Sequence, residues 1–208
     1  MSQWDISYVT NLDNAFANSN TNNLFNVPIG NWNTVNVTSM IATFSNAFHF
    51  DQDLSNWKTD NVTSMYLMFH KAYTFNQNLS TWNVSNVKSM NQMFRYSYSF
   101  NGNISGWTVD NVTDMQYMFS STYSFDQDLS NWNVTSNLSS YPTKLDSMFR
   151  TAPGFTKVLT GDWVNYNDGL SLTSNNSFTE ISTSFRPSIT VQDTSSRIQI
   201  IGQITGMS

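Results

Sequence analysis

The feature that most constrains this chain is a repeat of 25 residues. Each copy carries one tryptophan in nearly the same phrase, for example "NLSTWNVSNVKSMNQMF". A fixed period of 20 to 50 residues is typical of chains that stack similar units, because one unit cannot bury its apolar side chains alone. Degenerate copies near Trp4 and Trp163 extend the series, so we predict six fairly complete repeats and a partial seventh. The regularly spaced tryptophans are Trp32, Trp57, Trp82, Trp107 and Trp132.

The apolar periodicity changes within one repeat. Leu79, Trp82 and Val84 have the spacing of a short strand with one buried face. A second set, spaced as in an amphipathic helix, follows directly, with Ser85 or Asn86 where a helix N-cap would lie. We therefore predict a short strand, a turn and a short helix in each repeat. The helical set is Met90, Met93, Phe94 and Ser97.

Composition narrows the classes of function. Only 11% of the 208 residues are charged, the net charge is −5, and no run of Lys or Arg occurs. This balance argues against nucleic acid or an anionic membrane surface as a partner. The chain has no cysteine, which excludes disulfides, thiolate zinc sites and cysteine nucleophiles. No apolar run approaches the roughly 20 residues of a membrane span, so we expect no direct membrane insertion.

The repeat pattern L-S-x-W-x-V-S-N-V-T-x-M-x-x-M-F-x-x-A-x-x-F-[ND]-Q-[ND] resembles the 25-residue repeat of BspA-like surface proteins, which are leucine-rich-repeat relatives. The resemblance covers about residues 4 to 163. It implies an α/β repeat fold, a right-handed leucine-rich-repeat-like solenoid with short strands and short helices. It also implies a location outside the cell, at a cell surface, and adhesion to a host or prey surface protein or glycan without a cofactor.

The chain divides into two predicted parts. Residues 1–163 form the solenoid, and residues 164–208 contain alternating segments such as "SFTEISTSF", "SITVQD" and "RIQIIGQI" that are typical of strands. The second part is interpreted as a β-rich C-terminal cap that covers the last repeat. The alternative is an attachment segment through which the chain forms homo-oligomers.

The candidate catalytic groups are histidines and carboxylates. His49 and His70 occupy non-equivalent repeat positions and no nucleophile motif accompanies them. The Asp51/Asp53 and Asp126/Asp128 pairs lie three repeats apart, about 14 Å at ~4.8 Å per strand step, beyond the roughly 5–9.5 Å of a glycosidase pair. Asparagines fill the equivalent positions between them, which favours an Asp/Asn ladder that binds backbone groups at a turn. A calcium site stays an alternative, and we expect no enzyme activity.

Two surfaces are candidates for recognition. Residues that flank each tryptophan should form a polar strand face that binds a protein or a glycan, unless this face is merely solvated. The predicted binding residues are Asn56, Lys58, Asp60, Thr81, Asn83, Ser85, Thr108, Asp110, Asn131 and Asn133. An aromatic column of Tyr73, Tyr98 and Tyr123, preceded by Phe48, could pack against sugar rings or seal the back of the stack.

We expect the remaining variable positions to be ordinary, solvent-exposed surface. These are Tyr66, Leu67, Asn91, Gln92, Gln116 and Tyr117. The sequence therefore favours a non-catalytic adhesion module. A structural spacer or assembly module of a larger surface fibre is the alternative.

Overall fold

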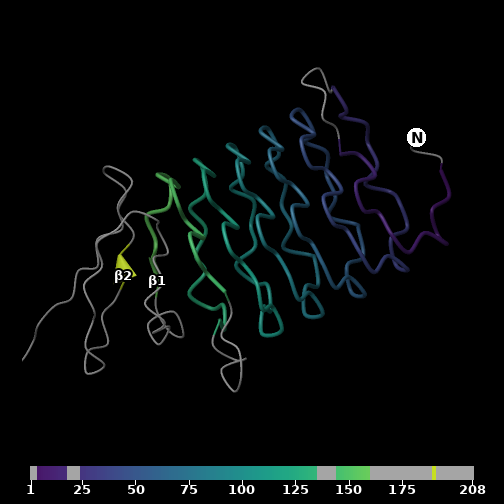
Figure 1. The fold of residues 1–208 in the computed structure, drawn as a ribbon. Helices are drawn as coiled ribbons and strands as arrows, with labels where there is room; N and C mark the ends of the chain where they lie inside the picture. Colours follow the sequence, from purple (N-terminus) through teal and green to yellow (C-terminus); the bar gives the residue numbers. More distant parts are fainter. Residues whose placement is uncertain (1–3, 18–23, 135–143, 160–188, 191–208) are drawn as a thin grey trace, which may run out of the picture.

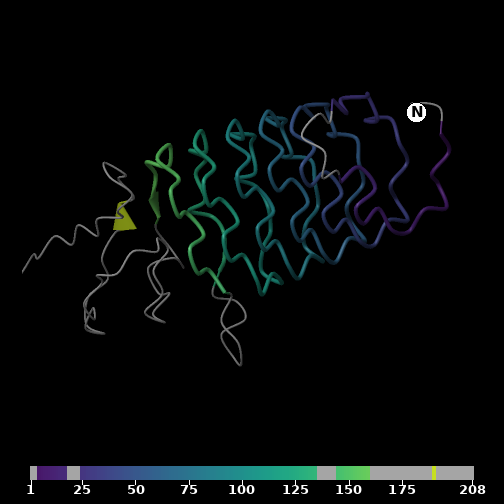
Figure 2. The ribbon, with the colours of Figure 1, turned by 45° about the horizontal axis from the view of Figure 1, so that its top comes forward.

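A computed structural model describes residues 4–17, 24–134, 144–159 and 189–190. Within these residues each sequence repeat makes one coil of chain. Figures 1 and 2 show successive coils lying side by side in a row, from the purple N-terminal coil to the green coil near residue 150. The coil-on-coil arrangement is the direct consequence of the 25-residue period, because equivalent side chains meet at each step along the row.

Backbone hydrogen bonds join the coils along one side. Isolated parallel bridges link Asn11, Ser39, Ser64, Ser89, Asp114 and Lys144 in succession. After each bridge, alternate residues donate to the next coil, as in Met65 N to Ser89 O at 2.9 Å. We call the segments joined in this way the ladder segments, and the side of the stack that they form the ladder face. The ladder segments are residues 10–16, 38–46, 63–71, 88–96, 113–121 and 144–151.

The short helices predicted over the methionine segments are absent from the described residues. The helical spacing did identify the buried side chains, since Met90, Met93, Phe94 and Ser97 are all buried. The local conformation is a run of tight turns, however, in which Met93 N donates to Met90 O and Phe94 N donates to Met118 O of the next coil. In a helix these N–H groups would bond to carbonyls four residues earlier in the same segment. The coils would then lose the backbone bonds that join them.

Left-handed residues recur twice in most ladder segments. Leu67 and Lys71 have φ of 56° and 59°, and Gln92 and Tyr96 have φ of 57° and 63°. A tight turn of this kind needs a positive φ at its third residue, a conformation that costs a non-glycine residue roughly 1–2 kcal/mol. The ladder segments therefore accept local strain in order to direct alternate N–H groups at the neighbouring coil.

Aromatic columns fill the interior. Phe44, Phe69, Phe94, Phe119 and Phe149 stack at 5.4–5.8 Å between ring centroids. A second phenylalanine column, in which Phe50 stacks on Phe25, packs against the first one. The tryptophan rings also stack from coil to coil, for example Trp82 on Trp107 at 6.5 Å. Because each ring is covered by its copies on both sides, one coil is stabilised by the next.

The predicted strands differ from those observed. The segment with Leu79, Trp82 and Val84 buries all three side chains but is not assigned to a strand. Beyond the last coil, β1 (Val158–Leu159) pairs antiparallel with β2 (Ile189–Thr190), with Val158 opposite Thr190. β2 falls within the predicted strand "SITVQD", whereas the other two predicted tail strands and the end of the tail lie outside the described residues.

Candidate functional site

The predicted binding residues lie on the outside of the tryptophan segments, on a surface that we call the Trp-side face. It is formed by the ten residues named as binding candidates above. Asn56, Lys58, Asp60, Thr81, Asn83, Thr108 and Asn131 are exposed, and Ser85, Asp110 and Asn133 are half-buried. The alternation around the tryptophans was therefore interpreted correctly, since Trp57, Trp82, Trp107 and Trp132 point inward.

Several of these side chains bind neighbouring coils or their own turn. Thr81 Oγ1 donates to Ser55 O at 2.6 Å, across to the preceding coil. Asn83 Nδ2 donates to Asp60 Oδ1 at 2.8 Å, while Asn83 Oδ1 accepts from Ser85 N at 3.1 Å. Part of the hydrogen-bonding capacity that a ligand would use is thus already engaged on the Trp-side face.

Buried groups beneath this face also join the coils through side chains. Four tryptophans donate their indole N–H to a carbonyl of the preceding coil, as in Trp82 Nε1 to Leu54 O at 3.0 Å; they are Trp57, Trp82, Trp107 and Trp132. Thr34 Oγ1 accepts from Lys58 N at 2.7 Å and donates to Lys58 O at 3.0 Å. Asn86 Nδ2 donates to Asp60 O at 2.7 Å, so this predicted cap residue bridges two coils instead. On this side, cohesion depends on particular side chains.

The Asp/Asn ladder has the role expected of it. A side-chain oxygen in one coil accepts the backbone N–H of the equivalent residue in the next, as in Asp51 Oδ1 with Asn76 N at 2.9 Å. The same bond recurs from Asn76 to Asn101 and from Asn101 to Asp126. Gln77 Nε2 also donates to Asp51 Oδ1 at 2.7 Å. These oxygens satisfy turn amides that would otherwise lack a partner.

The charged end of this ladder is held by its neighbours. Burial opposes ionisation of Asp126, but hydrogen bonds from Thr156 and Lys157 outweigh it and lower the pKa of this carboxyl. Lys157 Nζ lies 3.1 Å from Asp126 Oδ2.

Across the described ranges, no three His, Cys, Asp or Glu side chains cluster closely enough to hold a metal ion. Nor does any described helix have the length and apolar character needed to cross a membrane.

The aromatic column is a continuous stack along one edge of the coils. Phe48, Tyr73, Tyr98 and Tyr123 follow at 4.8, 4.7 and 4.8 Å between centroids, each pair within 16° of parallel. Burial, followed by the neighbouring tyrosines, raises the pKa of the Tyr98 hydroxyl. Because the ring faces cover one another, a sugar packed against this column would meet mainly ring edges and hydroxyls.

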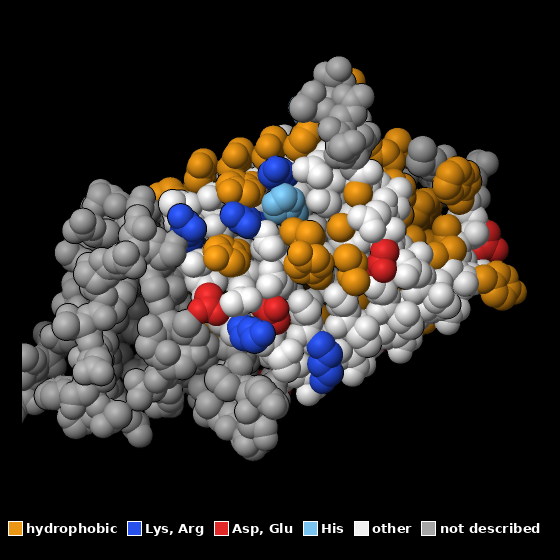
Figure 3. Space-filling model, in the orientation of Figure 1, with side chains coloured by type: hydrophobic (Ala, Val, Ile, Leu, Met, Phe, Trp, Pro, Cys, Tyr) orange, Lys and Arg blue, Asp and Glu red, His pale blue; other side chains and the backbone are white. Residues whose placement is uncertain are grey.

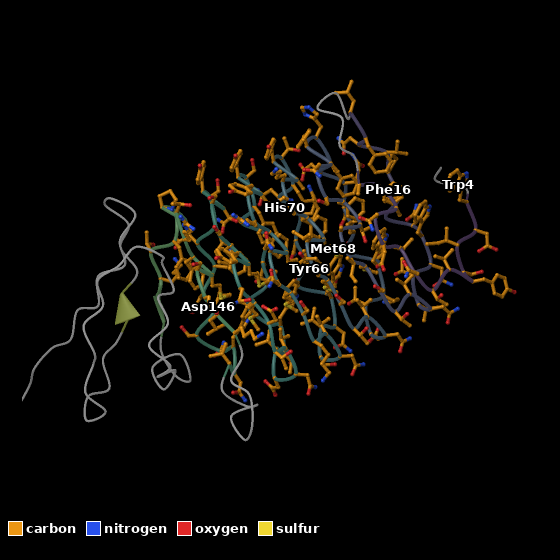
Figure 4. All side chains as sticks on the ribbon, viewed as in Figure 1. Trp4, Phe16, Tyr66, Met68, His70 and Asp146 are labelled. Atoms are coloured by element: carbon orange, nitrogen blue, oxygen red, sulfur yellow. The ribbon has the colours of Figure 1, made fainter. Side chains whose placement is uncertain are left out.

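The ladder face carries a cationic and aromatic group that was not predicted from the sequence, where Tyr117 alone of its members was expected to be ordinary surface. Arg95 Cζ lies 4.9 Å from the centroid of Tyr96 and 5.0 Å from that of Tyr117. His70 meets Tyr96 edge to face at 5.8 Å, and Lys71 Nζ lies 5.9 Å from the same ring. Figure 4 labels His70 and Tyr66 on this face, and Figure 3 shows Lys and Arg side chains gathered around the histidine. These residues come from three successive coils, a proximity that the 25-residue register could have indicated.

Burial and the two cations of this group keep the neighbouring histidine neutral, and one of the cations is held by hydrogen bonds. Burial, Lys71 and Arg95 lower the pKa of the His70 imidazole to about 4, so the ring is neutral at physiological pH. Arg95 donates to Gln92 Oε1 at 2.7 Å and to Tyr96 Oη at 3.2 Å, and its buried Nε has no partner. The guanidinium is thus fixed in one orientation between two rings.

Comparison with known proteins identifies a family but no activity. Two overlapping stretches, residues 1–96 and 78–191, match a family model described as "Mycoplasma protein of unknown function, DUF285". The two matches span most of the chain, which therefore belongs to the DUF285 family. No curated protein and no solved structure gives a significant match.

Proposed function

We propose that this member of the DUF285 family is a non-catalytic recognition module that binds a protein or glycan at a cell surface. One observation carries the proposal. Inward positions repeat the same chemistry in every coil, whereas outward positions change from coil to coil, as in Lys58, Asn83 and Thr108. Packing explains the repeated residues. The varied ones are exposed, so burial does not dictate their type, and a surface with varied polar groups suits multipoint recognition.

The Trp-side face remains the first candidate for this recognition. Its exposed members are mostly neutral, with Lys58 and Asp60 as charged exceptions. Contacts made mainly by neutral groups are little affected by salt, so a ligand bound here should show a weak dependence on ionic strength. The location outside the cell rests on the resemblance to BspA-like surface proteins.

A binding screen tests the proposal. The purified chain is screened against immobilised glycans and extracellular-matrix proteins, beside the variant Lys58→Ala/Asp60→Ala/Asn83→Ala/Asp110→Ala. The expected result is a ligand that binds the parent chain and is lost by the variant, with the far-ultraviolet circular dichroism of the two unchanged. If neither glycans nor matrix proteins bind the parent chain, the recognition function is wrong.

A structural spacer or assembly module is the second candidate, favoured by the N-terminal end of the stack. Trp4 stacks on Trp32 at 6.4 Å, yet 61% of Trp4 is exposed (Figure 4). Tyr8 and Leu24 are exposed in the same coils. Sedimentation of the parent chain and of Trp4→Ser tests this role. Concentration-dependent oligomers that the substitution abolishes would favour assembly over recognition.

A further inference from the structure

We propose that the ladder face holds a binding site for an acidic glycan, a chain of sugars that carries carboxylate or sulfate groups. The site is the cationic–aromatic patch, which we define as His70, Lys71, Gln92, Arg95, Tyr96 and Tyr117. It goes beyond the proposed function, because it assigns a separate surface and a ligand class to which the Trp-side face makes no claim.

The patch is a connected surface. Tyr96 lies at its centre, in contact with His70, Lys71 and Arg95, and Arg95 extends the patch to Tyr117. Tyr96 also meets Tyr98 at 6.5 Å, so the patch continues into the aromatic column. A ligand that lies across the coils would therefore meet aromatic rings, hydroxyl groups and cations in succession.

Charge is distributed unevenly in favour of this face. The chain as a whole carries −5. Of the seven Lys and Arg residues in the described part of the chain, five lie in the ladder segments between residues 63 and 151. The same ladder segments contain two aspartates, Asp114 and Asp146. Figure 3 shows these cations on one surface. The five cations are Lys71, Lys88, Arg95, Lys144 and Arg150. An anionic ligand would be attracted to this face even though the whole molecule is negative.

Within the described part of the chain, the two aspartates of these segments form no salt bridge with the cations of the patch. Asp114 accepts from Asn91 Nδ2 at 3.0 and 3.1 Å and from Gln116 N at 3.0 Å. Asp146 accepts from Gln116 Nε2 at 2.5 Å, and its position on the ladder face is labelled in Figure 4. Both carboxylates are therefore bound to amide groups. The described residues contain one salt bridge, between Lys157 and Asp126, and it lies outside the ladder segments.

The type of ligand follows from how the face is built. Its backbone groups already bond between coils, as in Gln92 N to Gln116 O at 2.9 Å and Tyr96 N to Ser120 O at 3.0 Å. A peptide could not extend this ladder as an added strand, because those bonds are used. Recognition is left to side chains. Tyrosine rings can pack against sugar rings, and a fixed guanidinium matches the two oxygens of a carboxylate or sulfate.

Calorimetric titration of the full chain tests the site. The probes are a heparin hexasaccharide, an oligogalacturonate hexamer and neutral maltohexaose, and hexaglutamate represents an acidic peptide. The double variant Lys71→Gln/Arg95→Gln and its component Arg95→Gln are compared with Lys157→Gln, which removes one charge, as Arg95→Gln does, but outside the ladder segments and the Trp-side face. Arg150→Gln, at an exposed ladder position, provides a milder variant should the first one unfold.

The expected result is binding of at least one acidic oligosaccharide that weakens with added salt. Lys71→Gln/Arg95→Gln should weaken it about tenfold or more, because each charged hydrogen bond contributes strongly. Arg150→Gln should weaken it about twofold to threefold. Lys157→Gln should leave it nearly unchanged.

Four outcomes would overturn the proposal: no acidic oligosaccharide binds, maltohexaose binds equally well, hexaglutamate binds more tightly, or Lys157→Gln weakens binding as much as Arg95→Gln does. Each of these leaves the proposed function intact if the Trp-side variant still loses a ligand found in the general screen. The two proposals can therefore fail separately.

Discussion

The Trp side and the ladder side of each coil are joined to their neighbours by different groups. On the ladder side the joining groups are mainly backbone amides and carbonyls, as in Leu67 N to Asn91 O at 3.0 Å. On the Trp side they are mainly side chains, as in Trp82 Nε1 to Leu54 O and Thr59 Oγ1 to Asn83 O at 2.9 Å. Every residue type except proline offers the same backbone groups, but few offer the required side chain.

This difference explains where the sequence repeats and where it varies. Tryptophan recurs at a fixed spacing because its indole N–H bonds to the preceding coil and its ring stacks on that of the next. The outward ladder positions Tyr66, Asn91 and Gln116 carry different side chains, because the backbone bonds beneath them do not depend on the side chain. The ladder side is thus where the chain can acquire binding chemistry at little cost to folding.

The largest expected effect comes from removing a tryptophan. Trp82→Ala deletes a buried ring and its hydrogen bond to the Leu54 carbonyl, which then keeps only the bond from Trp57 N, so we expect the free energy of unfolding to fall by about 3–5 kcal/mol. Tyr66→Ala, on the ladder face, should cost about 1 kcal/mol or less, since this side chain is only half-buried. Urea unfolding of both variants measures the difference. Equal losses would remove the distinction between the two sides.

The Asp/Asn ladder should come next. Asp51→Ala removes the acceptor for Asn76 N and Gln77 Nε2, and should lower the free energy of unfolding by about 1–2 kcal/mol. Asp51→Asn keeps a side-chain oxygen, as Asn76 and Asn101 do in other coils, and should cost less than about 0.5 kcal/mol. Urea unfolding of the two variants shows whether Asp51 stabilises the fold as a hydrogen-bond acceptor or through its charge.

The same position also tests the calcium alternative. If Asp51 serves the turn amides, added calcium should leave the thermal unfolding midpoint of the parent chain unchanged. A midpoint that rises with calcium and no longer does so in Asp51→Asn would show that the carboxylate binds the ion, contrary to this account.

Acid should weaken the ladder side through His70. Its pKa is lowered in the folded chain, so the unfolded chain takes up the proton first and stability is lost as the pH falls from 6.5 to about 4. The ring is partly exposed and its neighbours are Lys71, Arg95 and Tyr96, so we expect a loss of about 1–2 kcal/mol after allowing for solvent screening. Urea unfolding against pH measures it. His70→Gln should reduce the slope, whereas His49→Gln, at an exposed position, should not.

The smallest effect concerns the ladder turns. Ala42 is held at φ 52°, so Ala42→Gly should stabilise the chain slightly, by up to about 1 kcal/mol. Ala47 is buried and is not among the residues with positive φ, so Ala47→Gly should destabilise it by about 0.5–1 kcal/mol. Thermal unfolding of the pair compares the two signs. Two losses of equal size would mean that the ladder turns carry no strain.

The sequence predicted which residues lie inside better than it predicted their local structure. The spacing of Met90, Met93, Phe94 and Ser97 marks a buried set correctly, but tight turns that repeat every four residues bury the same set as a helix. Glycine would have signalled the left-handed positions, yet residues such as Leu67 occupy them. The leucine-rich-repeat class and the right-handed sense remain predictions.

The candidate sites were predicted unevenly for a related reason. Periodicity within one repeat placed Asn56, Lys58 and Thr81 on the outside, and the Asp/Asn ladder followed from its repeated composition. Arg95, Tyr96 and Tyr117 do not belong to columns that repeat in every coil, so repeated composition did not indicate them. Their proximity follows from the 25-residue register together with the turn geometry, which brings Arg95 beside Tyr117 of the next coil.

Amide hydrogen exchange in two matched variants tests the contrast between the sides most directly. Lys58 N donates to the Thr34 hydroxyl at 2.7 Å, whereas Gln92 N donates to the backbone carbonyl of Gln116 at 2.9 Å. The account predicts that Thr34→Val accelerates exchange at the Lys58 amide, while Gln116→Ala leaves the Gln92 amide protected. If Gln92 loses protection as strongly as Lys58 does, the ladder depends on its side chains after all, and the division between the two sides is wrong.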